Sequence, residues 1–90
     1  MNNNLETNPP NSHRYVGLWV TADGRIRQRL LAEGRYVEAR GANECAYSGS
    51  FQIRGDYITY QDDTGFHADG EFKNDILHHA GMVMYRADAE

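Results

Sequence analysis

Turn-forming residues recur along this chain at the short, even spacing that β-hairpins require, and this spacing constrains the fold more than any other feature. From Tyr15 to Arg86, β-prone runs alternate with clusters containing glycine, asparagine or aspartate, at the roughly 8 to 12 residue interval typical of barrels and sandwiches. No stretch of useful length has the period of a helix. The predicted strands are Tyr15–Thr21, Arg25–Leu31, Arg35–Ala39, Ala46–Ile53, Tyr57–Gln61, Phe66–Phe72, Ile76–His79 and Met82–Arg86.

Short connections between these strands predict an antiparallel meander. An open meander leaves two unpaired edge strands, and pairing the last strand with the first removes both. The sequence therefore predicts an all-β fold, a small antiparallel up-and-down barrel of about eight strands. A chain of 90 residues allows one such domain, because two smaller halves could not offset their chain entropy. We expect residues 15–86 to form the barrel, 1–14 a disordered leader and 87–90 a flexible C-terminal tail.

Charge and cysteine content narrow the class of partner. A net charge of -4 opposes attraction to phosphate backbones, so no nucleic acid and no anionic membrane surface is expected as a partner. Cys45 is the single cysteine, which excludes an intrachain disulfide framework and a multi-cysteine zinc site. The first residues contain no apolar run that would suggest a signal peptide or a membrane span. We therefore expect a cytoplasmic protein, and predict no metal and no cofactor.

Side-chain alternation assigns the inner and outer faces of the barrel. In strand 25–31, apolar residues and Gln28 alternate with three arginines, which should point outward into a solvated ladder of charges. A barrel of about eight strands is either filled by its side chains or holds one small ligand. The small residues expected to leave space in the lumen are Gly17, Gly49, Ala68 and Gly70, and those that could fill it are Tyr36, Tyr47, Tyr60 and Phe66.

The segment Gly17-Leu18-Trp19, together with Arg86 near the end of the chain, resembles the signature of the calycin superfamily, which includes lipocalins, fatty-acid-binding proteins and avidins. That resemblance implies that Trp19 packs at the closed end of the barrel beneath Arg86. A guanidinium over an indole contributes about 0.5 to 2 kcal/mol. The contact would join the first strand to the last.

The stretch from Tyr15 to Arg86 also resembles a small family of uncharacterised bacterial proteins assigned a streptavidin-like barrel. The resemblance implies a fold, and it assigns no catalytic or ligand residue. The matching residues are Asp23-Gly24-Arg25-Ile26-Arg27-Gln28, Gly34-Arg35-Tyr36, Glu38-Ala39-Arg40-Gly41, Ala46-Tyr47, Gly49, Asp62-Asp63-Thr64-Gly65-Phe66, Ala68-Asp69-Gly70, His79, Gly81-Met82 and Tyr85-Arg86.

If Trp19 and Arg86 mark the closed end, alternate turns of the meander meet at an open mouth. The mouth then collects Asp23, a long loop over Arg40–Cys45, the turn at 62–64 and the turn after His78 and His79. Loops at a barrel mouth commonly bind ligands, and the loop Arg40–Cys45 is the expected lid.

We predict that a small, partly polar molecule binds without covalent attachment at this mouth. Gln28 and Glu38 lie on or near the inner face, where each needs a polar partner, and we favour pairing within the protein over a ligand as that partner. The predicted ligand-binding residues are Gln28, Tyr36, Glu38, Asn43, Tyr47, Tyr60, Asp62 and His78.

Two other functions remain open at this point. An acid-base enzyme could use Asp62 or Glu38 with His78, although nothing in their spacing brings these groups together. An interaction or homo-oligomerisation module could use the outer face of the first strand, where Val16, Leu18 and Val20 would form an exposed apolar row. The sequence identifies no catalytic residue.

Overall fold

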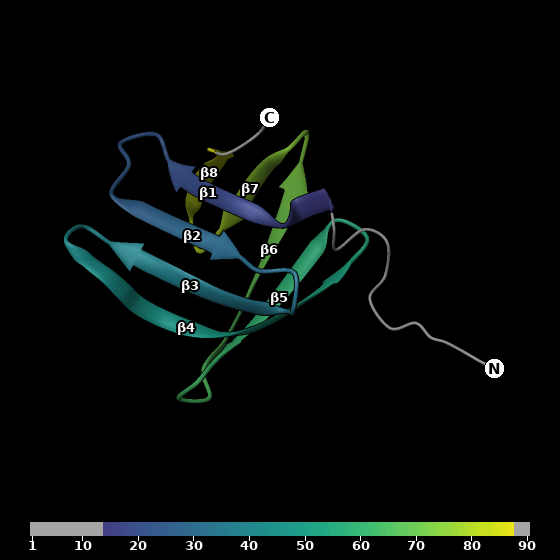
Figure 1. Ribbon diagram of the computed structural model, residues 1–90. Helices are drawn as coiled ribbons and strands as arrows, with labels where there is room; N and C mark the ends of the chain where they lie inside the picture. Colours follow the sequence, from purple (N-terminus) through teal and green to yellow (C-terminus); the bar gives the residue numbers. More distant parts are fainter. Residues whose placement is uncertain (1–13, 88–90) are drawn as a thin grey trace.

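Eight antiparallel strands close into a barrel in which each strand pairs with its neighbour in sequence and β8 pairs with β1 (Figure 1). The computed structural model describes residues 14–87, so most of the predicted leader and tail, residues 1–13 and 88–90, lies outside the described residues. The predicted all-β barrel is confirmed. The strands are β1 Gly17–Thr21, β2 Ile26–Leu30, β3 Arg35–Arg40, β4 Asn43–Arg54, β5 Tyr57–Asp62, β6 His67–Lys73, β7 Ile76–His79 and β8 Met82–Arg86.

The turns gather at two ends of the barrel. The β1–β2 and β3–β4 turns lie together at the left of Figure 1, and the β2–β3 and β4–β5 turns lie at the right. Tyr15 lies before β1 at the right-hand end, where its hydroxyl donates to Asp56 Oδ1 in the β4–β5 turn at 2.6 Å. The sequence predicts that Tyr15 begins the first strand. In the structure β1 begins at Gly17, and Tyr15 instead covers the end of the barrel.

Large apolar side chains fill the barrel beneath Tyr15. The rings of Tyr15 and Phe72 stack with centroids 3.7 Å apart, and the indole of Trp19 tilts against Phe72 at 5.0 Å. The indole Nε1–H of Trp19 donates to the backbone oxygen of Tyr15 at 2.9 Å, so this buried ring has its polar atom satisfied. The other buried residues of the core are Leu30, Tyr36, Phe51, Ile53, Ile58, Tyr60, Leu77 and Met84.

Arg86 closes the barrel at this end. Trp19 and Arg86 are direct cross-strand partners, and the guanidinium lies 4.5 Å from the centroid of the indole ring. Its Nη1 donates to the backbone oxygen of Val16 at 3.1 Å, and its Nη2 lies 3.3 Å from Asp75 Oδ1. The predicted contact between Trp19 and Arg86 is confirmed, which identifies the opposite end as the mouth.

Two of the glycines expected to leave space in the lumen instead allow strands to approach closely. A Cβ at Gly49 would lie 2.2 Å from the backbone oxygen of Gln61 in β5, and one at Gly70 would lie 2.8 Å from the backbone oxygen of His78 in β7. Backbone already occupies the volume that a side chain would take. The expectation of open space at Gly49 and Gly70 was therefore wrong.

The long loop expected at Arg40–Cys45, and with it the expected lid, is not found in the structure. β3 runs to Arg40 and β4 begins at Asn43, which pairs directly with Arg40, so the connection is a tight turn. Gly41 provides the left-handed conformation that this turn needs, with φ 57°. Cys45 is consequently an exposed strand residue. The single glycine was enough to turn the chain, and the polar residues after it extend a long strand.

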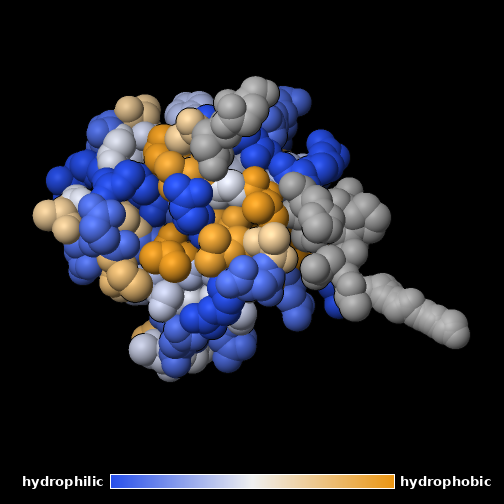
Figure 2. All heavy atoms as spheres, viewed as in Figure 1, coloured by the Kyte–Doolittle hydropathy of each residue, from blue (hydrophilic) through white to orange (hydrophobic). Residues whose placement is uncertain are grey.

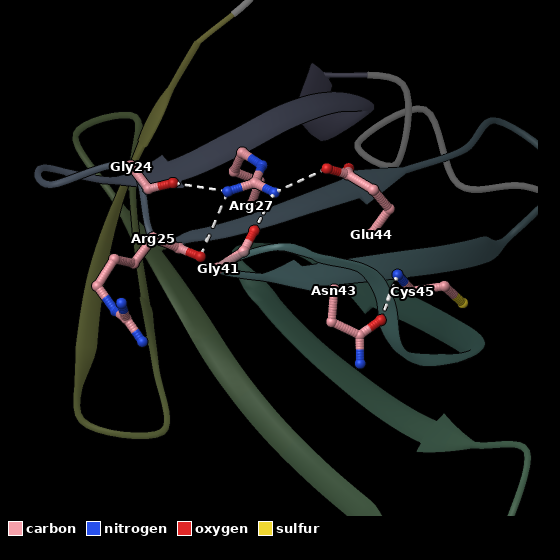
Figure 3. A network of polar contacts seen from close by, with 7 residues as sticks. All are labelled: Gly24, Arg25, Arg27, Gly41, Asn43, Glu44 and Cys45. Carbon is pink, nitrogen blue, oxygen red and sulfur yellow. Dashed lines mark hydrogen bonds and ion pairs between the residues drawn. The ribbon is translucent and has the colours of Figure 1, made fainter.

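Arg27 ties this turn to the neighbouring one (Figure 3). Its Nη1 donates to the backbone oxygen of Gly24 at 2.8 Å, and its Nη2 donates to the backbone oxygen of Gly41 at 3.0 Å. Nη2 also lies 3.4 Å from Glu44 Oε2, the kind of outward charge pair that the alternation of β2 predicted. The arginine therefore holds two mouth turns against each other.

The outer face of β1 is apolar but only partly open to solvent. Leu18 and Val20 are half-buried, and Figure 2 shows apolar side chains near the centre of the face that β1 and β2 present, surrounded by hydrophilic ones. Among the described residues, no helix is long and apolar enough to cross a membrane.

Candidate functional site: a cavity at the barrel mouth

The mouth of the barrel holds a cavity of about 330 Å³. This volume lies at the lower end of the range found for small-molecule sites. Tyrosines from β3, β4 and β5 supply much of the wall, so the surface is apolar with polar tips. The lining residues are Tyr36, Glu38, Arg40, Tyr47, Tyr60, Asp62, Phe66, His67, Ala68, His79 and Ala80.

A chain of hydrogen bonds crosses the inner wall of this cavity. The buried amide of Gln28 donates from Nε2 to Glu38 Oε1 at 3.0 Å, and its Oε1 accepts the hydroxyl proton of Tyr60 at 2.6 Å. Arg40 Nε donates to Glu38 Oε2 at 2.7 Å. The buried side chains of Gln28 and Glu38 therefore have partners within the protein, as the sequence analysis favoured.

The register between β2 and β3 explains the contacts of Gln28, Glu38 and Arg40. Gln28 and Glu38 are direct cross-strand partners, and Arg40 lies two residues beyond Glu38, on the same face of β3. Burial, with the nearby charge of Glu38, raises the pKa of Tyr60 far above its ordinary value. Its hydroxyl consequently stays protonated and keeps donating to Gln28, while the phenolic oxygen can still accept a hydrogen bond.

Tyr36 has an uncommitted hydroxyl on the same wall. Its ring packs edge-on against Tyr60 at 5.1 Å between centroids, and the residue is 5% exposed. Within the part of the chain that the structure describes, its hydroxyl has no hydrogen-bond partner. Burial first, and then the carboxylates of Asp62 and Glu38, raise the pKa of Tyr36. A neutral phenol therefore faces the cavity with its donor and acceptor both available.

His79 contributes a second uncommitted polar atom. The residue is 8% exposed, and its ring lies 4.5 Å from that of Tyr60 between centroids. Nδ1 lies 2.9 Å from the backbone oxygen of Asp69; a carbonyl oxygen only accepts, so Nδ1 carries the proton. The other nitrogen, Nε2, has no partner among residues 14–87, and in the neutral ring it is an acceptor.

Asp62 lies where β5 ends and organises the turn at the cavity rim. Its Oδ1 accepts from the backbone nitrogen of Thr64 at 3.0 Å, from the Thr64 hydroxyl at 2.7 Å and from the backbone nitrogen of Phe66 at 3.0 Å. These bonds, led by that of the Thr64 hydroxyl, hold the pKa of Asp62 below its usual range. Oδ2 has no partner in the described chain, so a charged oxygen remains available.

Two aromatic side chains stand at the opening. Tyr47 is 46% exposed and Phe66 is 76% exposed, and both line the cavity. Phe66 precedes β6 instead of starting it, which explains why this ring lies on the rim although the sequence analysis considered it as a filler of the lumen. The Arg40 guanidinium lies 5.1 Å from the centroid of the Tyr47 ring. The rim is therefore apolar and aromatic beside one paired cation.

The structure brings together five of the residues predicted from the sequence, Tyr36, Glu38, Tyr47, Tyr60 and Asp62. Gln28 lies behind the wall, bonded to Glu38. Asn43 is an exposed strand residue that does not line the cavity, and its Oδ1 accepts from the backbone nitrogen of Cys45 at 3.1 Å (Figure 3).

His78 is exposed on the opposite face of β7 from His79, so the histidine of the wall is His79. The residues that the alternative of an acid-base enzyme would require, His78 with Asp62 or Glu38, are therefore not brought together in this cavity. The alternation within β7 could have identified His79, since it shares a face with the buried Leu77. Arg40 was missed because it was assigned to a loop. Residues 14–87 contain no cluster of histidine, cysteine and acidic side chains that could hold a metal ion.

A closed barrel in which each antiparallel strand pairs with the next strand in sequence is an up-and-down β-barrel. Residues 12–86 match the sequence model of the family described as Agrobacterium tumefaciens protein Atu4866, and the chain belongs to this family. It is similar to the solution structure of the protein Atu4866 from Agrobacterium tumefaciens, with 55% identity and a TM-score of 0.76, covering 91% of this chain and 100% of that one. A search of curated proteins found no match.

Proposed function

We propose that this protein binds a small, partly polar molecule without covalent attachment in the mouth cavity. The observation that carries the proposal is a cavity of about 330 Å³ with two buried polar groups, the Tyr36 hydroxyl and His79 Nε2, that have no partner in the described chain. Leaving such a group unsatisfied costs about 1 to 3 kcal/mol. A ligand that pairs with them recovers this cost.

The type of barrel agrees with this role. Small barrels such as lipocalins and streptavidin hold one small ligand in their interior, and the contact between Trp19 and Arg86 resembles that of the calycin superfamily. The packed closed end leaves the mouth as the place where a ligand would enter. The paired side chains of Gln28, Glu38 and Tyr60 supply a rigid wall, which lowers the entropy cost of binding.

The proposal is tested by titrating a library of small fragments while recording the amide spectra of the protein. We expect shift changes to concentrate at Tyr36, Tyr60 and His79. Ala68→Trp places a large ring in the cavity and should abolish these changes, because Ala68 lines it. Gln52→Trp, at an exposed position on β4, is the matched control and should leave them intact. Binding that persists unchanged in Ala68→Trp would refute the mouth as the site.

A further inference from the structure

Most of the polar atoms of the cavity that can still form hydrogen bonds are acceptors. Three of them accept hydrogen bonds: Asp62 Oδ2, His79 Nε2 in the neutral ring, and the phenolic oxygen of Tyr60, whose proton is already donated to Gln28. The Tyr36 hydroxyl can serve either way. The cavity wall is therefore complementary to a ligand that donates hydrogen bonds.

The charges of the cavity also favour a ligand that donates hydrogen bonds, and in particular a cation. Glu38 and Arg40 neutralise each other across 2.7 Å, which leaves Asp62 as the carboxylate of the wall that has no cation beside it within residues 14–87. The three bonds at its Oδ1 fix the orientation of the carboxylate. The net charge of the chain, -4, adds a weak long-range attraction for cations.

The aromatic lining suits a positively charged group as well. Tyr36, Tyr60 and Phe66 contribute to the wall beside Tyr47, whose ring already lies 5.1 Å from the Arg40 guanidinium. An aromatic ring face attracts a cation with about 0.5 to 2 kcal/mol, depending on exposure. Flat apolar groups also pack well on such rings.

We propose that the ligand is a small organic cation, a protonated amine carried on a flat or apolar body, with the ammonium held by Asp62 Oδ2 and the body packed among the tyrosines. This inference rests on the proposed function and specifies its ligand class. Tyr36 and His79 then pair with further polar groups of the bound molecule.

Three probes with one body and different charges test the inference. 2-Phenylethylamine is a cation at neutral pH, 2-phenylethanol is neutral and phenylacetate is an anion. Each is titrated into the full chain at pH 7 while the amide shifts of the cavity residues are followed. We expect the amine to bind about tenfold more tightly than phenylacetate, with the alcohol between them.

Two variants locate the source of the preference. Asp62→Asn keeps an oxygen that can hold the turn and removes the charge, so the amine should lose about tenfold in affinity while the alcohol stays within twofold. Asp63→Asn makes the same change of charge one residue away, at a side chain that pairs with Arg35 outside the cavity. It should leave the affinities for all three probes unchanged, which also controls for the total charge of the protein.

The outcomes separate this inference from the proposed function. Cavity shifts with equal affinities, or with phenylacetate tightest, would overturn the cation preference and leave ligand binding at the mouth standing. An amine preference that survives Asp62→Asn would overturn the role of Asp62. The absence of cavity shifts for every probe and every fragment would refute the proposed function itself.

Discussion

The two ends of this barrel use their aromatic residues in opposite ways. At the closed end, Tyr15, Trp19 and Phe72 pack on each other in a buried cluster. At the mouth, Tyr47 and Phe66 stand exposed at the rim of a cavity. The polar atoms of the two ends differ as well. The indole nitrogen of Trp19 donates to the backbone oxygen of Tyr15, whereas the hydroxyl of Tyr36 at the mouth has no partner in the described chain.

The proposed binding site and the largest aromatic cluster of the core therefore lie at different ends of one small domain. A core without voids stabilises the fold, whereas buried polar groups that lack partners cost stability and suit recognition. One end of the barrel packs its aromatic rings against each other in the core, whereas the other end lines a cavity with them.

The largest effect is expected at the closed end. Trp19→Ala removes a fully buried ring and leaves a cavity, which should lower the free energy of unfolding by about 3 to 5 kcal/mol. Tyr47→Ala removes a half-exposed ring at the rim and should cost less than about 1 kcal/mol. Urea unfolding of both variants measures the contrast. Similar losses for the two would show that the closed end does not dominate stability.

Within the mouth, two neighbouring tyrosines should respond differently to loss of their hydroxyls. Tyr60→Phe leaves the buried Oε1 of Gln28 without its 2.6 Å donor, at a cost of about 1 to 3 kcal/mol. Tyr36→Phe removes a buried hydroxyl that has no partner in the described chain, so it should leave the free energy of unfolding unchanged or raise it by up to about 1 to 3 kcal/mol. Equal destabilisation by both substitutions in a chemical denaturation series would contradict the separation into wall and ligand-facing groups.

A smaller effect is expected where the mouth turns meet. Arg27→Lys cannot reach the backbone oxygens of both Gly24 and Gly41 with one ammonium, so we expect a loss of about 0.5 to 1.5 kcal/mol. The amide of Gly41, which donates to the backbone oxygen of Arg25 at 2.7 Å, should exchange faster with deuterium.

Arg25→Lys is the matched control for this experiment, because the side chain of Arg25 extends away from the network in Figure 3. It should leave both stability and exchange at Gly41 unchanged. If Arg27→Lys behaves like Arg25→Lys, the two turns are held by their own backbone geometry.

The smallest effect is a dependence of stability on pH at the β5–β6 turn. The bidentate bond from Arg35, at 3.0 and 2.8 Å, and then the bond from Ser48, lower the pKa of Asp63. The native state therefore binds a proton less readily than the unfolded chain, so this stabilisation is present above the unfolded pKa and is lost as pH falls through the folded one.

Asp63→Asn should accordingly destabilise the protein slightly at neutral pH and have a diminishing effect as the solution is acidified towards the folded pKa. The measurement is the difference in thermal midpoint between the two proteins at a series of pH values from neutral to strongly acidic. The exposed position of the pair keeps the effect small. A difference that grows on acidification would have the wrong sign.

Much of the fold could be predicted from the sequence, because hairpin turns and strand faces depend on residues that are close together in the chain. Turn residues such as Gly55 and the alternation around Gln28 report directly on hairpins and on the inner face, because both depend on neighbours in sequence. That Gln28 and Glu38 would have polar partners within the protein followed from the need to satisfy buried polar groups, although the sequence left open which partners these would be. Strand ends were less certain: Asn43 and Cys45 have the polar character of a loop but continue β4.

The candidate site was predicted only in part. Tyr36, Glu38 and Tyr60 were identified because inward alternation selects them. His79 and Arg40 were not, since their roles depend on which of two adjacent histidines faces inward and on where β3 ends.

The sequence by itself determined the strand order and the inner face of most strands, because period and turn chemistry are properties of short segments. The closed end at Trp19 and Arg86 was implied by the resemblance to the calycin superfamily. Only the tertiary structure decided whether small residues leave a cavity or bring strands together. Gly49 and Gly70 face backbone at close range, whereas Ala68 opens onto the mouth. The physical reason is that empty volume depends on the separation of strands distant in sequence, which no local pattern records.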